Sequence, residues 1–283
     1  MNPTVAIVAQ GAMGAGVGAR LVENGLRVVT SLTGRSAASA KRAEAAGMVA
    51  VSDQEASQAD FFLSIVPPAE AIALAERMSP LIAAGNKKTV YVDCNAVSPP
   101  TKISVGEIVT AAGSPFVDAS IMGAPPKPGS DGPLFAASGE DSKAFAALSE
   151  FGLKIHTLTG PIGAATALKM SYAGITKGTT ALASMMMLAA TRAGIADDFL
   201  AELQRSQPGP LATFMRAVPD MFDKAYRYNG EMAEIADYAG DDPAARKVYK
   251  AFEEFYTRLA ADAEGEKVEI GALAAFLKVE PKK

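Results

Sequence analysis

The sequence contains one cysteine and one histidine among its 283 residues. Cys94 has no second cysteine with which to form a disulfide or a cysteine metal cluster. His156 lies in a predicted strand, distant in the chain from every motif described below, and we expect it to be structural. Because Cys, His and acidic residues do not cluster, no metal site is predicted. No serine lies in a nucleophile-elbow sequence, which argues against Ser-His-Asp catalysis.

The sequence also lacks a long uncharged apolar run and an excess of positive charge. Its longest helical stretch, residues 160–194, is interrupted by Lys169, Lys177 and Arg192, so it does not predict a membrane span. The net charge of −4 argues against a nucleic-acid partner. Residues 1–9 carry no basic segment of the kind that begins a signal peptide. We therefore expect a cytoplasmic protein without membrane or nucleic-acid partners.

The composition is that of a folded protein. Hydrophobic residues make up 49% of the chain and charged residues 20%, which is enough to form a substantial packed core. A chain of this length predicts about two domains at roughly 150 residues each.

A strand, a glycine turn and a helix are predicted at the start of the chain. The apolar run Thr4–Ala9 leads directly into the sequence QGAMGAGVGARLVENG. In the dinucleotide-binding pattern G-x-G-x-x-G, Gly11 would let the backbone approach a pyrophosphate, and Gly14 would allow close packing of helix on strand. Ala9 replaces the first glycine, and Ala12 and Met13 complete the turn. An ordinary tight turn without a ligand is the alternative interpretation.

The residues that follow the second predicted strand, Arg27–Ser31, favour NADP(H) over NAD(H) as the cofactor. An Asp or Glu at this place would bind the ribose 2′-hydroxyl of NAD, but no acidic residue occurs between Glu23 and Glu44. Thr33, Arg35 and Ser36 follow the strand instead. A guanidinium and hydroxyl groups suit a 2′-phosphate, so the sequence predicts NADP(H) as cofactor, with a solvated basic loop as the alternative.

The pattern of strands alternating with helices continues to about residue 158. It predicts an α/β fold, a doubly wound parallel sheet of the Rossmann type. Ligands bind such sheets at the carboxyl ends of the strands. Three segments are expected there: Val66-Pro67-Pro68, the loop at Asn95, and Met122-Gly123-Ala124.

The rest of the chain is predicted to be helical. A long helix over 163–193 begins a second, all-α domain, with further helices over 197–205, 210–221, 224–239 and 243–263. We place the domains at 1–162 and 163–283. The long helix carries more apolar surface than its own domain would cover, so we expect a homodimer that forms through the C-terminal helical domain.

Five short segments carry a family resemblance. They are AQGAMG at 9–14, SIVPP at 64–68, VDCNAVSP at 92–99, DASIMGAP at 118–125 and GPIGAATALKM at 160–170. In this order the chain resembles the β-hydroxyacid dehydrogenase and 6-phosphogluconate dehydrogenase superfamily, as a divergent branch. The resemblance implies that Lys169 is the catalytic lysine, that Asn95 lies on the nicotinamide side, and that 118–124 is the substrate loop. From its own position near a strand end, Asp118 is expected to hold loop backbone.

The departures from this resemblance concern the substrate. Met122 stands where the family has a serine, Ala124 replaces a glycine, and Ala173 replaces an asparagine. Tyr172 stands where the phosphogluconate branch has histidine. These changes make a compact acidic sugar a weaker expectation and a bulkier or more apolar carbonyl compound a plausible substrate. The substrate-binding candidates are Ser120, Met122, Gly123, Ala124 and Thr176.

The expected chemistry is hydride transfer between NADP(H) and a carbonyl or hydroxyl carbon, with Lys169 as general acid or base. A lysine in an apolar helix at a domain junction loses hydration, which lowers its pKa toward a useful range. Tyr172, three residues further, would hydrogen-bond the same oxygen or orient the amine. The prediction is a dehydrogenase acting on CH–OH groups. Reduction of a C=N bond on the same fold and a catalytically silent NADP(H)-binding protein are the alternatives. The alternative for Lys169 is a structural lysine, whose side chain only extends from the apolar helix to place its amine in solvent.

Overall fold

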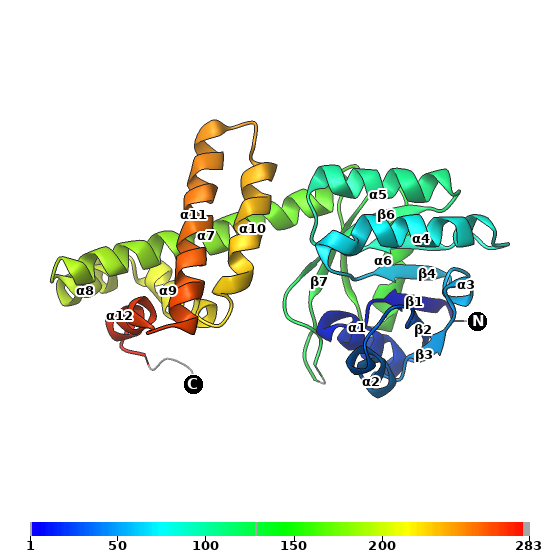
Figure 1. The fold of residues 1–283 in the computed structure, drawn as a ribbon, viewed down its shortest axis with the longest axis horizontal. Helices are drawn as coiled ribbons and strands as arrows, with labels where there is room; N and C mark the ends of the chain where they lie inside the picture. Colours follow the sequence, from blue (N-terminus) through cyan, green and yellow to red (C-terminus); the bar gives the residue numbers. More distant parts are fainter. Residues whose placement is uncertain (1, 128, 280–283) are drawn as a thin grey trace. The chain divides into compact units, whose positions relative to one another are not determined.

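The computed structural model describes residues 2–127 and 129–279 (Figure 1). The chain divides into two compact units, Met1–Lys169 and Met170–Lys283. The division falls within helix α7 (Ala164–Arg192), directly after Lys169, whereas the sequence places it before that helix. Lys169 is therefore the last residue of the first unit.

A single eight-stranded sheet organises the described part of the first unit. Its order is β3-β2-β1-β4-β5-β6-β7-β8. The strands are β1 (Thr4–Val8), β2 (Arg27–Ser31), β3 (Val49–Val51), β4 (Phe61–Ser64), β5 (Val90–Asp93), β6 (Phe116–Met122), β7 (Leu134–Ser138) and β8 (Lys154–Thr157). Neighbours are parallel except β6 and β7, which are antiparallel. The predicted doubly wound, mostly parallel sheet is confirmed.

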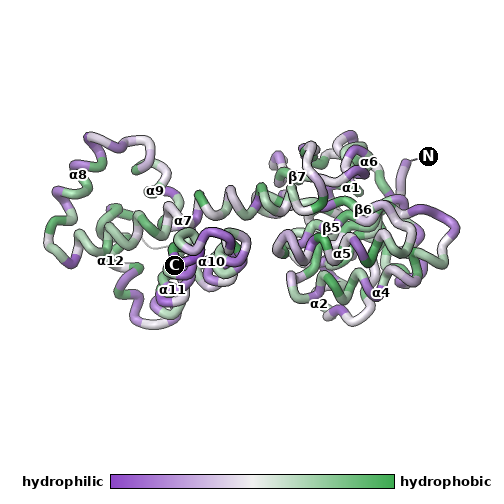
Figure 2. The backbone as a smooth tube through the Cα atoms, turned by 90° about the horizontal axis from the view of Figure 1, so that it is seen from above, coloured by the Kyte–Doolittle hydropathy of each residue, from purple (hydrophilic) through white to green (hydrophobic). Residues whose placement is uncertain are grey.

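Alternate residues of the strands face two separate apolar layers. In Figure 2, which colours the backbone by hydropathy, strands β5 and β6 are mostly green, the colour of hydrophobic residues. Val5 and Ile7 of β1 pack in the layer that includes α1 (Ala12–Glu23) and α2 (Ala37–Ala45). Ala6 and Val8 pack in the layer that includes α4 (Ala71–Ala83) and α5 (Pro99–Ala111). Because both faces are covered by helices, these strands are apolar throughout rather than alternating. The short helices α3 (Asp53–Ala56), η1 (Pro68–Glu70), α6 (Ser142–Ala146) and η2 (Ala147–Phe151) complete the unit.

The described part of the second unit is all-helical, as predicted. After α7 it contains α8 (Ala196–Ser206), α9 (Pro208–Met221), α10 (Ala225–Tyr238), α11 (Pro243–Glu264) and α12 (Val268–Leu277). The rings of Tyr228 and Tyr256 join α10 to α11 edge to face, 5.3 Å apart. The sequence pattern does not predict α12, since VEIGALAAFL is apolar on nearly all sides and shows no helical stripe. Its Ile270, Leu273 and Phe276 are buried in the core of this unit.

Candidate active site at the carboxyl ends of the strands

The glycine turn after β1 has the geometry of an anion site. Gly11 is the N-cap of α1, without a side-chain cap, and a Cβ built on it would meet nothing within 4 Å. A Cβ on Gly14 would lie 1.9 Å from the carbonyl oxygen of Ala9, so only glycine fits there. The first N–H groups of a helix, here those of Ala12 and Met13, have no partner within the helix. The open turn, these donors and the helix dipole fit the pyrophosphate of a dinucleotide.

Two side chains hold this turn in place. Gln10 is fully buried, and its side-chain amide donates to the carbonyl oxygens of Ile7 (3.4 Å) and Ser31 (3.0 Å) and to the Thr30 hydroxyl. From α2, Arg42 Nε donates to the Gln10 carbonyl at 2.8 Å. The turn is thereby fixed to both β2 and α2.

The loop after β2 carries the residues predicted to select the nucleotide. The Ser36 hydroxyl accepts the Ser39 N–H as the N-cap of α2, and the Thr33 N–H donates to the Ser31 hydroxyl. Arg35 pairs with Glu70 at 2.9 Å, and its side chain is 17% exposed. The sequence contains no acidic residue near Arg35, but the fold supplies Glu70 from η1. The remaining N–H donors of the guanidinium have no protein acceptor among the described contacts.

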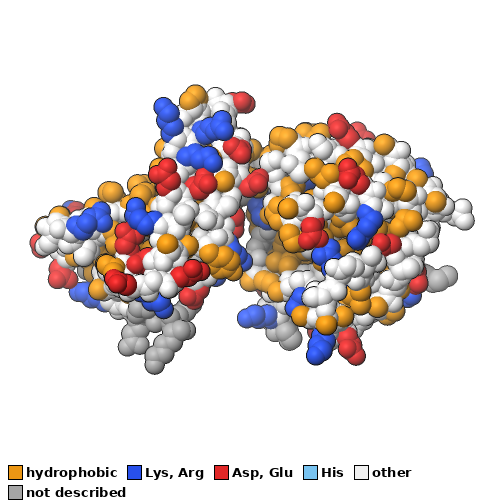
Figure 3. Space-filling model, viewed as in Figure 1, with side chains coloured by type: hydrophobic (Ala, Val, Ile, Leu, Met, Phe, Trp, Pro, Cys, Tyr) orange, Lys and Arg blue, Asp and Glu red, His pale blue; other side chains and the backbone are white. Residues whose placement is uncertain are grey.

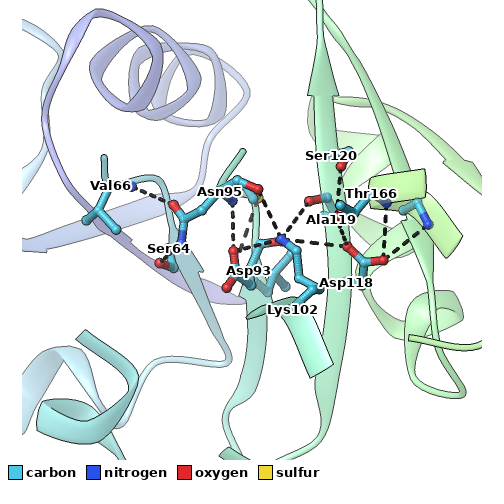
Figure 4. Close-up of polar contacts among 12 residues, drawn as sticks. Ser64, Val66, Asp93, Asn95, Lys102, Asp118, Ala119, Ser120 and Thr166 are labelled. Atoms are coloured by element: carbon cyan, nitrogen blue, oxygen red, sulfur yellow. Dashed lines mark hydrogen bonds and ion pairs between the residues drawn. The ribbon is translucent and has the colours of Figure 1, made fainter. Parts of the chain in front are cut away.

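Asn95 connects the ends of β4 and β5. Its Oδ1 accepts the N–H of Val66 at 2.7 Å, and its Nδ2 donates to the hydroxyl of Ser64 at 2.7 Å (Figure 4). The side chain is buried. It therefore holds the turn that leads into Pro67 and Pro68, the second segment assigned to the cofactor.

A buried ion cluster lies between β5, α5 and β6. Lys102 Nζ donates to Asp93 Oδ1 at 2.9 Å and lies 3.6 Å from Asp118 Oδ1, and all three side chains are completely buried (Figure 4). Sequence reasoning missed Lys102 and Asp93. The one available signal was that Lys102 is a charged residue on the apolar side of a helix, with Val105 and Val109 on the same side.

Asp118 anchors the start of α7 to the sheet. Its Oδ2 accepts the N–H groups of Gly163 (2.9 Å), Ala165 (3.1 Å) and Thr166 (3.3 Å), and its Oδ1 accepts the Thr166 hydroxyl (3.0 Å). A carboxylate at these free N–H groups also interacts favourably with the helix dipole. Asp118 was expected to hydrogen-bond the backbone of its loop. It does accept backbone N–H groups, but they belong to the start of α7.

Lys169 belongs to the second turn of α7, at the same edge of the sheet. Burial, together with the positive charge of Lys102, lowers its pKa from 10.5 to about 8, while the Cys94 thiol acts weakly in the opposite direction. Burial in turn raises the pKa of Cys94. The catalytic lysine candidate therefore lies within electrostatic reach of the loop after β5 and of α5.

The candidate residues of the substrate loop differ in burial, contacts and backbone conformation. Ser120 is buried, with its hydroxyl 3.5 Å from that of Thr166. Met122 ends β6, and Gly123 has a φ of +126°, a left-handed backbone conformation that favours glycine, with a Cβ placed there 3.2 Å from the Pro133 Cα. Ala124 follows in the loop. These residues and Lys169 belong to one unit.

Tyr172 and Thr176 belong to the second unit, although they continue the same helix. Tyr172 is 61% exposed. The Thr176 hydroxyl donates to the Tyr172 carbonyl oxygen at 3.0 Å, so it is occupied by helix backbone. Both residues lie on α7, the helix that also carries Lys169.

The described residues include no group of three or more His, Cys, Asp or Glu side chains placed to bind a metal ion. Among them, no helix has the length and apolarity needed to cross a membrane. Acidic and basic side chains are mixed on the face of each unit visible in Figure 3.

The fold and the glycine turn define a dinucleotide-binding protein. The family described as the NAD binding domain of 6-phosphogluconate dehydrogenase matches residues 4–155, and the chain belongs to this family. Residues 190–259 match a second family, described as a domain of unknown function (DUF1932). The predicted superfamily is confirmed, and the chain is a nicotinamide-dependent oxidoreductase in the general sense.

The solved structures that are similar to the chain include three with informative descriptions. The conserved protein MTH1747, described as structurally similar to 3-hydroxyacid dehydrogenases, is 28% identical with a TM-score of 0.77, over 92% of this chain and 98% of that one. A 3-hydroxyisobutyrate dehydrogenase from Mycobacterium tuberculosis is 21% identical with a TM-score of 0.74, over 93% and 95%. An imine reductase variant from Myxococcus stipitatus, solved with NAD+, is 17% identical with a TM-score of 0.63, over 98% and 100%. The last two show the fold alone.

Proposed function

We propose that the protein is an NADP(H)-dependent oxidoreductase acting on a carbonyl or hydroxyl substrate, with Lys169 as its general acid and base. The observation that carries this proposal is the position of Lys169 in the unit that also holds the open glycine turn at Gly11, where burial lowers its pKa to about 8. A structural lysine at the protein surface keeps its ordinary pKa. A general acid or base is most effective with a pKa near the working pH.

Different residues are proposed for cofactor binding and for proton transfer. Gly11, Ala12, Met13 and Gly14 would hold the pyrophosphate, and Val66–Pro68 and Asn95 would hold the nicotinamide half. Hydride transfer is the chemistry that this cofactor would supply when bound. Lys169 donates a proton to the carbonyl oxygen in reduction and takes one from the hydroxyl in oxidation. Tyr172 orients the amine or the oxygen.

The preference for NADP(H) over NAD(H) rests on Thr33, Arg35 and Ser36. No acidic residue occurs between Glu23 and Glu44, the interval that contains β2 and the loop after it, and a carboxylate in that loop is what binds the ribose of NAD. The Arg35 guanidinium has five N–H donors, of which the contact with Glu70 uses one. The other donors are available to a 2′-phosphate.

We assign the chemical class of the substrate and not an individual compound. Met122 and Ala173 place apolar groups where the resemblance implies polar ones, which favours a carbonyl compound less polar than an acidic sugar. The same two residues favour a second candidate, reduction of a C=N bond. We assign substrate contacts to Ser120, Met122, Gly123, Ala124 and Thr176, and dimer formation to the helical unit.

Turnover of NADPH with aldehydes, keto acids and cyclic imines, followed at the nicotinamide absorbance, tests the function. Lys169→Met should slow a positive reaction by about 10²–10⁴-fold, the contribution of a positioned acid or base. The matched control is Lys143→Met, an exposed lysine in the same unit, which should leave the rate unchanged. Equal activity of Lys169→Met and the parent would contradict the proposal. NADPH binding without turnover of any compound would favour a silent binding protein.

A further inference from the structure

The loops after β2 and β4 flank the glycine turn on its two sides. In the sheet, β1 lies between β2 and β4, and the three strands are parallel, so their carboxyl ends lie at one edge. On one side, the Gln10 side chain donates to the Ser31 carbonyl oxygen at 3.0 Å. On the other side, the Ala9 N–H donates to the Ile65 carbonyl oxygen at 3.2 Å. A dinucleotide bound at this turn would therefore lie between the two loops.

An ion pair connects these two loops across the turn. Arg35 comes from the loop after β2 and Glu70 from η1, which follows β4, and Arg35 Nη2 lies 2.9 Å from Glu70 Oε2. The Arg35 N–H also donates to the Leu32 carbonyl oxygen at 3.0 Å, which closes a tight turn at Gly34, where φ is +71°. The guanidinium is thus held from two directions, by the turn of its own loop and by a carboxylate from the opposite loop.

The two members of this pair act in opposite directions on a ribose 2′-phosphate. The guanidinium of Arg35 attracts the phosphate, whereas the carboxylate of Glu70 is a second anion on the same guanidinium and repels it. A ribose 2′-hydroxyl carries no charge, so the same carboxylate does not repel NAD(H) at this position. A group that acts on one ligand and not on its competitor changes specificity.

We propose that Glu70 is a specificity-determining residue, whose carboxylate holds Arg35 across the turn and limits the preference for NADP(H) over NAD(H). The chain has no acidic residue in the loop after β2, and the fold brings one there from the far side of β1. The inference rests on the proposed function, because Glu70 has this effect only if Arg35 binds a 2′-phosphate.

The variant Glu70→Gln tests the inference by binding alone. Its amide oxygen can still accept a hydrogen bond from the guanidinium, so the variant removes the charge and keeps the contact. The Glu70 side chain is 47% exposed, so the change leaves the packed core untouched. In calorimetric titrations of the full chain, the dissociation constant for NADPH should fall by roughly three- to tenfold, the size of one charge–charge interaction near the surface. The dissociation constant for NADH should stay nearly unchanged.

Salt provides a second readout that a purely steric effect would not move. The gain in NADPH affinity should shrink at about 1 M salt, where the screening length is roughly 3 Å. Adenosine 2′,5′-bisphosphate and adenosine 5′-monophosphate, which differ only in the 2′-phosphate, should show the same change in relative affinity. Agreement between these fragments and the whole cofactors would place the effect at the adenosine half.

The matched control is Glu55→Gln. The pair Arg27–Glu55 has the same residue types and the same 2.9 Å distance, but Arg27 begins β2 and so lies at the opposite edge of the sheet from Arg35. Glu55→Gln changes the net charge of the protein by the same amount as Glu70→Gln. It should leave the affinities for both cofactors unchanged.

An unchanged ratio of the two dissociation constants in Glu70→Gln would overturn the inference. Weaker binding of NADPH by this variant would overturn it as well, since Glu70 would then serve only to hold Arg35 in place. The proposed function fails by different results, namely full turnover by Lys169→Met or NADPH binding that Arg35→Ala does not weaken. The two conclusions are therefore tested by separate variants.

Discussion

Removal of the Lys169 amine should make the protein more stable as well as less active. The pKa of Lys169 falls from 10.5 to about 8 in the folded chain, a difference of about 2.5 units. At 1.36 kcal/mol per unit this corresponds to roughly 3 kcal/mol that opposes folding at neutral pH, as an upper value. Lys169→Met keeps the apolar stem and removes this term.

The effect has a defined pH dependence. Because the folded pKa lies below the unfolded one, the penalty is complete below about pH 8 and disappears as the pH approaches 10.5. For a unit of this size, 1 kcal/mol corresponds to roughly 2–4 °C in Tm, so the Tm of Lys169→Met at pH 7 should exceed that of the parent by up to about 6–12 °C. The difference should shrink steadily between pH 8 and pH 10.

Differential scanning calorimetry of the parent, Lys169→Met and the control Lys143→Met at pH 7, 8.5 and 10 provides the measurement. The transition of the first unit is the one to follow, because a chain of two units need not unfold in one step. A Tm for Lys169→Met equal to or below that of the parent at pH 7 would refute the reasoning. So would a stabilisation that does not change with pH, since packing alone would then explain it.

Four further predictions concern other parts of the molecule. Arg35→Ala should weaken NADPH binding by about 10- to 150-fold, with NADH binding nearly unaffected, because one charge-assisted contact of about 1.5–3 kcal/mol is lost. Calorimetric titration of both cofactors measures these affinities, and tighter binding of NADH than of NADPH by the parent would contradict the prediction. Gly14→Ala should abolish binding of either cofactor, because its Cβ would lie 1.9 Å from the Ala9 carbonyl oxygen. Tyr172→Phe should slow turnover by about tenfold, less than Lys169→Met, if its hydroxyl only orients the reacting groups; a greater loss than that of Lys169→Met would exchange their roles. Light scattering should show a dimer, and Leu182→Asp, at an apolar position 51% exposed on α7, should give the monomer of 29.2 kDa.

The sequence by itself determined the elements and the class of fold. Apolar runs between helical patterns predict buried strands, and the two predicted over Thr4–Ala9 and Arg27–Ser31 are observed over Thr4–Val8 and Arg27–Ser31. Gly14 was identifiable because a helix that packs this closely on a strand excludes a Cβ. Short local segments also select Arg35 and Lys169, and the roles assigned to these two residues stay predictions. The helix α12 was missed because an evenly apolar segment has no period to detect.

Only the tertiary structure decided which distant groups meet. Asp118 and Gly163 are separated by 45 residues, and Arg35 and Glu70 by 35, so no periodicity or spacing connects them. The order of strands in the sheet brings the ends of β5 and β6 together, and burial then requires that every charge there find a partner. That requirement pairs Lys102 with the carboxylates of Asp93 and Asp118. Burial in the folded chain also lowers the pKa of Lys169, and burial depends on which segments pack together and not on their order in the chain.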